Sequence, residues 1–441
     1  MKKTFLAVAL ALSALLGVKA QQKYVPTEEN LKSREEFRDM KLGIFLHWGI
    51  YSMYAQGEWY LNNGIDRNEY AKAADAFYPH RFDARKWVRS IKDAGAKYIC
   101  FTSRHHDGFS MWKTAQSKYN IVDATPFGRD VIKELAQACH EEGIRLHFYY
   151  SHLDWMRDDY PMGRTGTNVG KSREKSDWES YFAFMNNQLT ELLTQYGPIG
   201  AIWFDGWWDH DEDKVPFDWH LPEQYAMIHR LQPSCLVGNN HHGAPIEGED
   251  FQLFERDLPG EMTTGFAKEV AEVSRLPLET CQTMNGMWGF KVADNKYKSV
   301  DDIVRLLVKT AGKGANLLMN IGPQPNGELP ALALDRLKGV GEWLRTYGET
   351  IYGTDAGASG PQPWGVTTQK DGVTFAHVIT PECIVPNEQG EPVLYLPYRG
   401  KVKEVIEFVG GKKMQFHKTS TGISVVLPRS IDVVDYVLVV R

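Results

Sequence analysis

Residues 144–208 contain three segments in succession: IRLHFYYS (144–151), WESYFAFMNNQLTELLTQYG (178–197) and GAIWFDGWW (200–208). The first and third are short apolar runs rich in aromatic and β-branched residues, which is typical of buried strands. In the middle segment the apolar residues recur at helical spacing, and Gly197 stands where a helix would end. This order predicts two parallel strands joined by a helical crossover.

The same alternation continues on both sides, from Lys41 to about residue 355. Further strand candidates lie at 42–49, 97–106, 235–240, 250–255, 276–283 and 315–323, and further amphipathic segments at 130–143, 221–233 and 301–314. About eight parallel strands within roughly 320 residues favour a (β/α)8-type barrel over an open doubly wound sheet. The first strand is not followed by a glycine-rich dinucleotide-binding motif, which further disfavours the open sheet.

The pattern changes after residue 354. Short runs such as GVTFAHVI, PVLYLPY, GISVVLP and VVDYVLVV are separated by Gly, Pro and Asn, with no helical segment between them. Such runs are typical of a small antiparallel β-sandwich. The predicted fold is therefore α/β, with a (β/α)8-like catalytic domain over residues 21–354 and a C-terminal β-sandwich over residues 355–441.

The N-terminus has the pattern of a secretory signal. Lys2 and Lys3 precede an apolar run over residues 5–16, and small residues follow up to Ala20. We therefore expect a signal peptide over residues 1–20 and export to the periplasm or the cell exterior. No later segment is long and apolar enough to predict a membrane span. The net charge of −6 argues against nucleic acid as a partner, because phosphate binding needs a basic face.

Cysteine and histidine spacing does not indicate a metal site or a cofactor. The five cysteines are scattered, without a C-x-x-C pair, and their odd number leaves at least one thiol free. The metalloprotease motif H-E-x-x-H is absent. His105 and His106 are adjacent, so on a regular strand they would point to opposite faces unless the backbone bends there.

Polar and aromatic side chains stand at nearly every predicted strand end, which is where a barrel of this type places its active site. Asp205 is the strongest single candidate. Trp203 and Asp205 are two residues apart and point to the same side of a strand, and a carboxylate among large rings is costly to bury without a function. The acidic residues that follow, Asp209 to Asp213, are expected to form a solvated loop.

Imidazole, indole and carboxylate groups around one pocket suit a polyhydroxylated ring, because imidazoles bind hydroxyls and indole faces pack on C–H groups. Cleavage of a glycosidic bond needs two carboxyl groups. Asp205 supplies the first, and the residues leave the second open between Glu58, Glu247, Glu249 and Glu255. Glu255 closes an apolar run, which favours a raised pKa and hence a general acid.

Six blocks in order along the chain are similar to those of glycoside hydrolase family 29, the α-L-fucosidases: KLGIFLHWGIYS, GEWY, KYICFTSRHHDGF, IWFDGWW, NLLMNIGPQPNGELP and GEWLRTYGETIYGT. This resemblance implies a retaining exo-α-L-fucosidase that needs no cofactor and acts on fucosylated glycans. It implies Asp205 as the nucleophile and selects Glu255 as the acid/base, with Glu58 as the alternative.

The resemblance also implies a set of sugar-binding residues, namely His47, Glu58, Trp59, His105, His106, Tyr149, Trp203, His241, Trp288 and Phe290. The rings of Trp288 and Phe290 would contact the fucose methyl group. The chain has His241 and His242 where an arginine often lies in the family, so an arginine contact to the sugar would have to come from Arg256. Two alternatives are a galactoside-cleaving relative and a sugar-binding barrel with weak catalysis.

Overall fold

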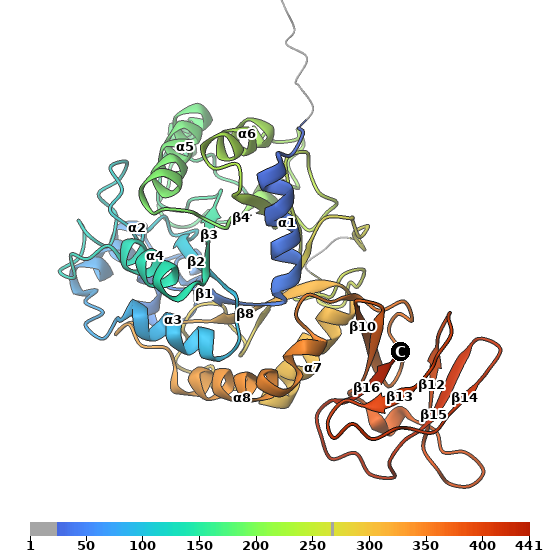
Figure 1. Cartoon of the computed structure of the whole chain (residues 1–441). Coiled ribbons are helices and arrows are strands. Elements are labelled where there is room, and N and C mark those ends of the chain that lie inside the picture. The colour runs from blue at the N-terminus through green and yellow to red at the C-terminus, as the bar shows by residue number, and fades with distance from the viewer. Residues whose placement is uncertain (1–23, 266–268) are drawn as a thin grey trace, which may run out of the picture.

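The computed structural model describes residues 24–265 and 269–441, so the expected signal peptide lies outside the described residues. Eight parallel strands form a barrel (Figure 1): β1 (Leu42–Leu46), β2 (Tyr98–Arg104), β3 (Arg145–Ser151), β4 (Ala201–Asp205), β5 (Leu236–Asn239), β6 (Gln252–Glu255), β7 (Leu278–Thr283) and β8 (Ala315–Ile321). Each coincides with one of the apolar runs in the sequence. The prediction of a (β/α)8-type barrel is confirmed.

The sheet runs in the order β5-β4-β3-β2-β1-β8-β7-β6. Each neighbouring pair is parallel, with Tyr149 opposite Trp203 and Ser151 opposite Asp205 between β3 and β4, and the register of β2 against β3 shifts between Thr102 and Arg104. The described residues include no hydrogen-bonded ladder between β5 and β6, so the barrel is nearly closed rather than fully closed. Because all the strands are parallel, their carboxyl ends lie at the same end of the barrel, which forms its mouth.

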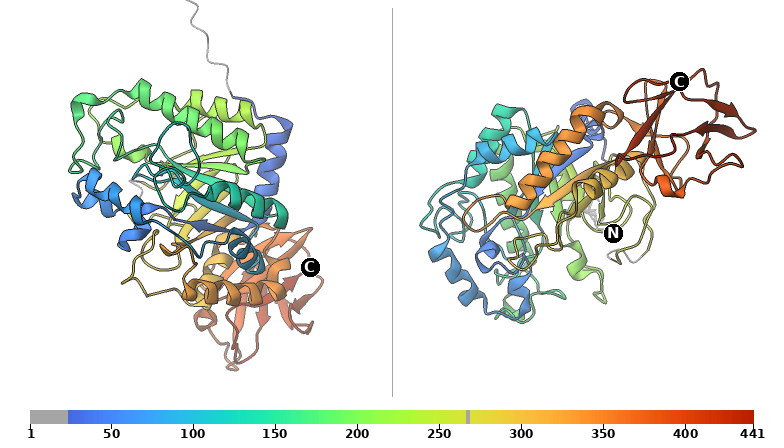
Figure 2. Two further views of the ribbon diagram at one scale, coloured as in Figure 1. Left: turned by 90° about the vertical axis from the view of Figure 1, so that its left-hand side faces the viewer. Right: turned by 90° about the horizontal axis from the view of Figure 1, so that it is seen from below.

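Within the described residues, eight α-helices accompany the strands (Figures 1 and 2): α1 (Glu28–Met40), α2 (Arg67–Ala71), α3 (Ala84–Asp93), α4 (Val131–Glu142), α5 (Trp178–Gln195), α6 (Leu221–Leu231), α7 (Val300–Gly312) and α8 (Ala331–Tyr347). The amphipathic segments of the sequence became α4, α5, α6 and α7. Between β5 and β7 the described residues form no helix, so the outer ring of helices is incomplete on that side.

Helix α1 packs at the amino-terminal end of the barrel. Phe37 is fully buried, and its ring lies 5.0 Å from the ring of Phe251 and 5.4 Å from that of Tyr98. Arg34 donates to Asp250 at 2.6 Å, and the same carboxylate accepts the backbone N–H of Val237 at 2.7 Å. Asp250 precedes β6, and Val237 lies on β5. The Asp250 carboxylate therefore connects these two strands, which form no ladder with each other.

The C-terminal part forms two antiparallel sheets. The strands are β9 (Asp355–Ala356), β10 (Gly365–Lys370), β11 (Val373–Val378), β12 (Val393–Pro397), β13 (Val405–Glu407), β14 (Phe416–Lys418), β15 (Gly422–Val426) and β16 (Tyr436–Val440). Five of them pair in the order β13-β16-β11-β10-β9 and three in the order β12-β15-β14. This arrangement confirms the antiparallel β-sandwich.

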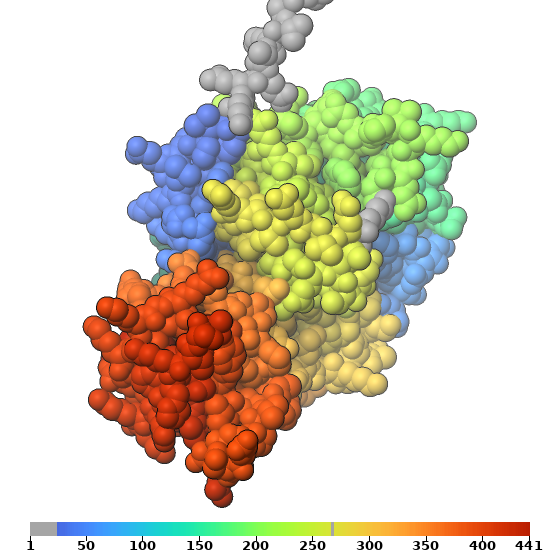
Figure 3. Space-filling view, turned by 90° about the vertical axis from the view of Figure 1, so that its right-hand side faces the viewer, coloured from blue at the N-terminus to red at the C-terminus, as the bar shows by residue number. Residues whose placement is uncertain are grey.

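The sandwich forms one lobe beside the barrel (red in Figure 3) and packs on α7. Arg305 of α7 donates to the carbonyl of Ile379 at 3.2 Å. A Cβ atom at Gly312 would lie 2.5 Å from Cβ of Val366, so only glycine allows α7 to approach β10 this closely. These contacts are on the helical flank, away from the mouth of the barrel.

All five cysteines lie within the described residues, and all five are free thiols. Four are buried, as expected for cysteines that act as small apolar side chains, and Cys383 is exposed. Among the described residues, no helix combines the length and apolar character that a membrane crossing requires.

Candidate active site

A cavity of about 980 Å³ opens at the carboxyl-terminal mouth of the barrel. Eleven of the twelve site residues proposed from the sequence line it: His47, Glu58, Trp59, His105, His106, Tyr149, Trp203, Asp205, His241, Glu255 and Trp288. They come from strands and from the loops after strands that are far apart in the chain, and the parallel barrel brings them together.

Asp205 ends β4 and is surrounded by hydrogen-bond donors. Its Oδ1 accepts from the backbone N–H of Gly206 at 2.8 Å, from Nε1 of Trp208 at 3.0 Å and from Nδ2 of Asn240 at 3.3 Å. Its Oδ2 accepts from the hydroxyl of Tyr149 at 2.9 Å. Four donors stabilise the ionised carboxylate and hold it in one orientation.

Asn240 joins the two carboxyl groups proposed for catalysis. The same Nδ2 atom that donates to Asp205 also donates to Oε2 of Glu255 at 2.8 Å. Because both distances are measured from one nitrogen, the two carboxylate oxygens are at most about 6 Å apart. This limit is compatible with the roughly 5–5.5 Å of a retaining glycosidase and shorter than the roughly 6.5–9.5 Å of an inverting one.

The environment of Glu255 favours its protonated form. Burial, together with the negative charge of Asp205, raises the pKa of Glu255 to about 7. Its side chain remains 13% exposed, and Oε2 lies 3.8 Å from Nε2 of His242. A carboxyl group that is half protonated near neutral pH and reaches the cavity can donate a proton to a leaving oxygen.

The other three glutamates proposed as alternatives are placed differently. Glu58 lines the cavity but is 2% exposed, and its Oε2 accepts the backbone N–H of Gly289 at 2.7 Å. Burial raises its pKa also. Glu249 lies outside the cavity lining and accepts from Tyr225 at 3.1 Å, while Glu247 is exposed near the N-terminal segment. Of the four candidate glutamates, Glu255 and Glu58 line this cavity with Asp205.

Three histidines form one side of the cavity. His47 follows β1, and its Nδ1 lies 2.7 Å from Oδ1 of Asn320. His105 and His106 both reach the cavity because β2 ends at Arg104 and the chain turns, with the N–H of Gly108 donating to the carbonyl of His105. This is the backbone bend that the adjacent pair required. Burial lowers the pKa of His47 to about 3 and that of His106 to about 4, so both are neutral near pH 7.

Aromatic rings complete the cavity. Tyr149 and Trp203 stack with ring centres 5.6 Å apart, and Trp59 stacks on Trp208 at 5.5 Å. Below Trp203, the buried carboxyl group of Glu279 accepts from the indole N–H at 2.9 Å and holds the ring in place. Arg256 lines the cavity, and its guanidinium lies 5.1 Å from the centre of the Trp288 ring.

Phe290 is the one proposed residue that the structure does not bring to the cavity. Its carbonyl accepts the N–H of Gly57 at 3.1 Å, and the preceding residue, Gly289, is bound by Glu58. These two backbone contacts hold the segment so that Trp288, and not Phe290, faces the cavity.

The prediction that Asp209 belongs to a solvated loop was wrong. Asp209 is 1% exposed and accepts from the hydroxyls of Tyr160 at 2.8 Å and Thr165 at 2.6 Å. It therefore anchors the segment around residues 160–165 beside the cavity. Glu212 and Asp213, with side chains 65% and 44% exposed, do belong to a solvated surface.

The sequence did not predict that Asn240 and Trp208 donate to Asp205. The available signal was the polar group Asn239–His242 at a strand end. Trp207, His241 and Arg164 also line the cavity. Within the described residues, no cluster of three or more His, Cys, Asp or Glu side chains could hold a metal ion.

A barrel whose strand ends bring two carboxyl groups together among indole and imidazole rings defines a glycoside hydrolase site. A family model described as alpha-L-fucosidase matches residues 11–349. The plasma alpha-L-fucosidase of Rattus norvegicus is 30% identical over 364 residues, which cover 75% of this chain and 73% of that protein. The alpha-L-fucosidase of Branchiostoma floridae is 29% identical over 404 residues, covering 83% and 82%.

Solved structures agree with these relatives. Alpha-L-fucosidase isoenzyme 1 from Paenibacillus thiaminolyticus is 32% identical, has a TM-score of 0.81, and the match covers 93% of this chain and 99% of that one. A trapped covalent intermediate of a GH29 alpha-L-fucosidase from Bacteroides thetaiotaomicron is 25% identical with a TM-score of 0.78, covering 95% and 99%. The chain belongs to glycoside hydrolase family 29, the α-L-fucosidases.

Proposed function

We propose that this protein is an exo-acting, retaining α-L-fucosidase in which Asp205 is the nucleophile and Glu255 is the acid/base. The bridge made by Asn240 carries the assignment, because it limits the distance between Oδ1 of Asp205 and Oε2 of Glu255 to about 6 Å. The covalent intermediate named for the Bacteroides thetaiotaomicron relative supports the same mechanism.

In the first step, the terminal fucose lies against the histidines and indole rings of the cavity. Oδ2 of Asp205 has a single hydrogen-bond donor, Tyr149, whereas Oδ1 has three donors, so Oδ2 is the better nucleophile. It bonds to the anomeric carbon while the bond to the leaving oxygen breaks. That oxygen takes the proton of Glu255, and the aglycone leaves as an alcohol.

In the second step, Glu255 is ionised and acts as the base. A water molecule loses a proton to Glu255 and bonds to the anomeric carbon, and the bond from that carbon to Asp205 breaks. Two inversions at the same carbon retain the configuration. Glu58 then acts as a hydroxyl-binding group, since its Oε2 is already engaged by Gly289.

The substrate and the stereochemistry are tested together. We expect 4-nitrophenyl α-L-fucoside to be hydrolysed and the galactoside, glucoside and β-L-fucoside to be hydrolysed at least about a hundredfold more slowly, because each misplaces a hydroxyl or the leaving group in a site of fixed donors and acceptors. Proton NMR of the fresh product should show α-L-fucose before mutarotation. β-L-Fucose as the first product would contradict retention, and a preference for the galactoside would contradict the substrate.

The pH dependence follows from the raised pKa of Glu255. The first step requires a protonated acid, so kcat/KM for a fucosyl oligosaccharide is expected to fall as the pH rises through about 7. This fall is the alkaline limb of the pH profile. A glutamine side chain cannot lose a proton, so the residual activity of Glu255→Gln on an activated aryl fucoside should show no alkaline limb. Glu58→Gln is the matched control and should keep the limb. A limb that disappears in Glu58→Gln instead would transfer the acid/base role to Glu58.

The N-terminal sequence pattern supports a proposal of export, with fucosylated glycans met in the periplasm or outside the cell. Fusing residues 1–24 to a reporter enzyme and fractionating the cells would test this proposal. A reporter retained with its full N-terminus in the cytoplasm would contradict it.

A further inference from the structure

We infer that Asn320 and Ser151 are positioning residues that hold His47 and His106 as their Nδ1–H tautomers, so that both histidines present Nε2 to the sugar as hydrogen-bond acceptors. This inference rests on the proposed function and deepens it. It assigns a direction to the hydrogen bonds: at these two points the substrate hydroxyl donates and the protein accepts.

The tautomer of His47 follows from Asn320. The Nδ2 atom of Asn320 lies 2.8 Å from the carbonyl oxygen of Trp288, which can only accept, so the amide nitrogen must be on that side. The amide oxygen of Asn320 therefore faces Nδ1 of His47 at 2.7 Å. Because an amide oxygen can only accept, Nδ1 carries the hydrogen and Nε2 has the lone pair.

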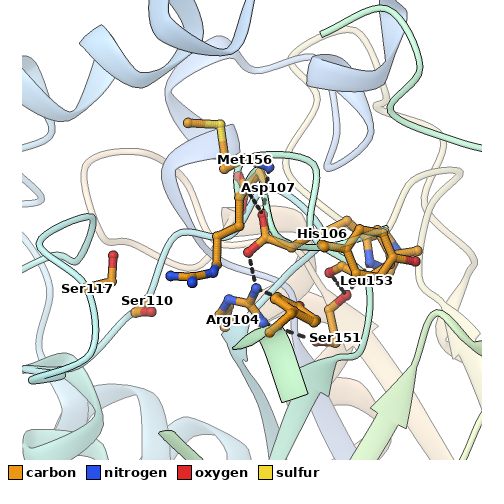
Figure 4. A network of polar contacts seen from close by, with 12 residues as sticks. Arg104, His106, Asp107, Ser110, Ser117, Ser151, Leu153 and Met156 are labelled. Carbon is orange, nitrogen blue, oxygen red and sulfur yellow. Dashed lines mark hydrogen bonds and ion pairs between the residues drawn. The ribbon is translucent and has the colours of Figure 1, made fainter. Parts of the chain in front are cut away.

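The tautomer of His106 follows from Ser151 (Figure 4). The Ser151 hydroxyl donates to the carbonyl of Leu153 at 2.6 Å, so its one hydrogen is committed. The same oxygen lies 2.7 Å from Nδ1 of His106 and must accept there. Arg104 holds this segment by donating to the backbone carbonyl of Ser151 at 3.2 Å. Nδ1 of His106 is thus protonated, and Nε2 is an acceptor.

This arrangement places two hydrogen-bond acceptors next to each other in the cavity. Nε2 of His106 lies 3.5 Å from Oδ2 of Asp205, and both atoms carry lone pairs. Burial lowers the pKa of His106 and keeps its imidazole neutral. Since the one hydrogen of the neutral ring is on Nδ1, facing Ser151, Nε2 has none to donate to Asp205. A sugar hydroxyl that enters beside them supplies the missing hydrogen, so binding removes an unfavourable contact next to the nucleophile.

Two carboxyl groups that can accept, those of Glu58 and Asp205, line the same cavity. Glu58 is a carboxylate when it is ionised, and Asp205 already receives four donors from the protein. A ligand whose ring substituents donate is therefore favoured over one whose substituents only accept. Fluorine tests this property directly, because it is close to hydroxyl in bond polarity but cannot donate a hydrogen bond.

The wild-type enzyme provides the first test. Inhibition constants are measured for L-fucose and for its deoxy and deoxyfluoro analogues at carbons 2, 3 and 4. At two or more of these carbons, replacing the hydroxyl by fluorine is expected to weaken binding about tenfold relative to L-fucose, as much as replacing it by hydrogen. If the fluoro analogues bind within about twofold of L-fucose at every position, the histidines donate and the inference is wrong.

Ser151→Ala provides the second test. Without the serine acceptor, His106 can move its hydrogen to Nε2 and donate to the ligand. We expect the fluoro analogue at one carbon to recover to within about threefold of L-fucose in this variant, while the deoxy analogue stays weak. Ser110→Ala is the matched control, because this buried hydroxyl accepts from Gln188 and not from a histidine. Equal fluorine penalties in Ser151→Ala, Ser110→Ala and wild type would overturn the assignment for His106.

The outcomes separate the inference from the function on which it rests. An enzyme that neither hydrolyses an aryl α-L-fucoside nor binds L-fucose would contradict the proposed function. An enzyme that does both but tolerates fluorine at all three carbons would contradict only the tautomer assignment. If Ser151→Ala does not fold, the wild-type series alone still decides between donating and accepting histidines.

Discussion

Asp205→Asn is expected to lower kcat/KM for α-L-fucosides by at least about a thousandfold without loss of the fold. The amide keeps an oxygen for the three donors at Oδ1 and places an NH2 group toward the hydroxyl of Tyr149, which can accept. The hydrogen bonds therefore survive, but the attacking carboxylate is gone. Steady-state rates and thermal unfolding measure the two effects separately.

Asp213→Asn is the matched control, because it makes the same change in the same acidic run at a side chain that is 44% exposed. It should leave the rates within about twofold of wild type. A sharper test uses Asp205→Gly and azide. With the carboxylate removed, azide attacks the anomeric carbon directly and should yield β-L-fucosyl azide, with inverted configuration. Near wild-type hydrolysis by Asp205→Asn, or retention of configuration in the azide product, would show that another group is the nucleophile.

Glu255→Ala is expected to slow hydrolysis of a fucosyl oligosaccharide by roughly a hundredfold to ten-thousandfold, because the leaving oxygen no longer receives a proton. The effect on the first step should be small for a dinitrophenyl fucoside, whose leaving group needs no acid. The covalent intermediate should then accumulate, since water also lacks its base. A burst of dinitrophenol followed by a slow steady state is the expected time course.

Azide distinguishes this residue from the nucleophile. It needs no base, so it should release the intermediate of Glu255→Ala and yield α-L-fucosyl azide, with retained configuration. Glu58→Ala is the control within the same cavity; it should raise KM without azide rescue, because Oε2 of Glu58 accepts from Gly289 and its proposed role is to bind the sugar, not to protonate the leaving oxygen. Rescue of Glu58→Ala, and none of Glu255→Ala, would exchange the two assignments.

The barrel and the position of Asp205 could be predicted because both depend on local patterns. Apolar runs separated by amphipathic helices determine parallel strands, and the two-residue period of a strand places Trp203 and Asp205 on one side. The same local reasoning failed at Asp209. A run of acidic residues is usually solvated, but here the hydroxyls of Tyr160 and Thr165, more than forty positions earlier in the chain, satisfy and bury one of its members.

By itself, the sequence determined the order of strands and helices, the mouth of the barrel as the place of the site, and one of the two carboxyl groups, because these depend on periodicity along the chain. Only the tertiary structure decided which glutamates face Asp205, that Phe290 turns away, and that Asn240 joins Asp205 to Glu255. The same holds for the histidine tautomers, which depend on partners such as Asn320 and Ser151. Hydrogen-bond direction and carboxyl spacing arise between residues far apart in sequence, so they exist only once the barrel has formed.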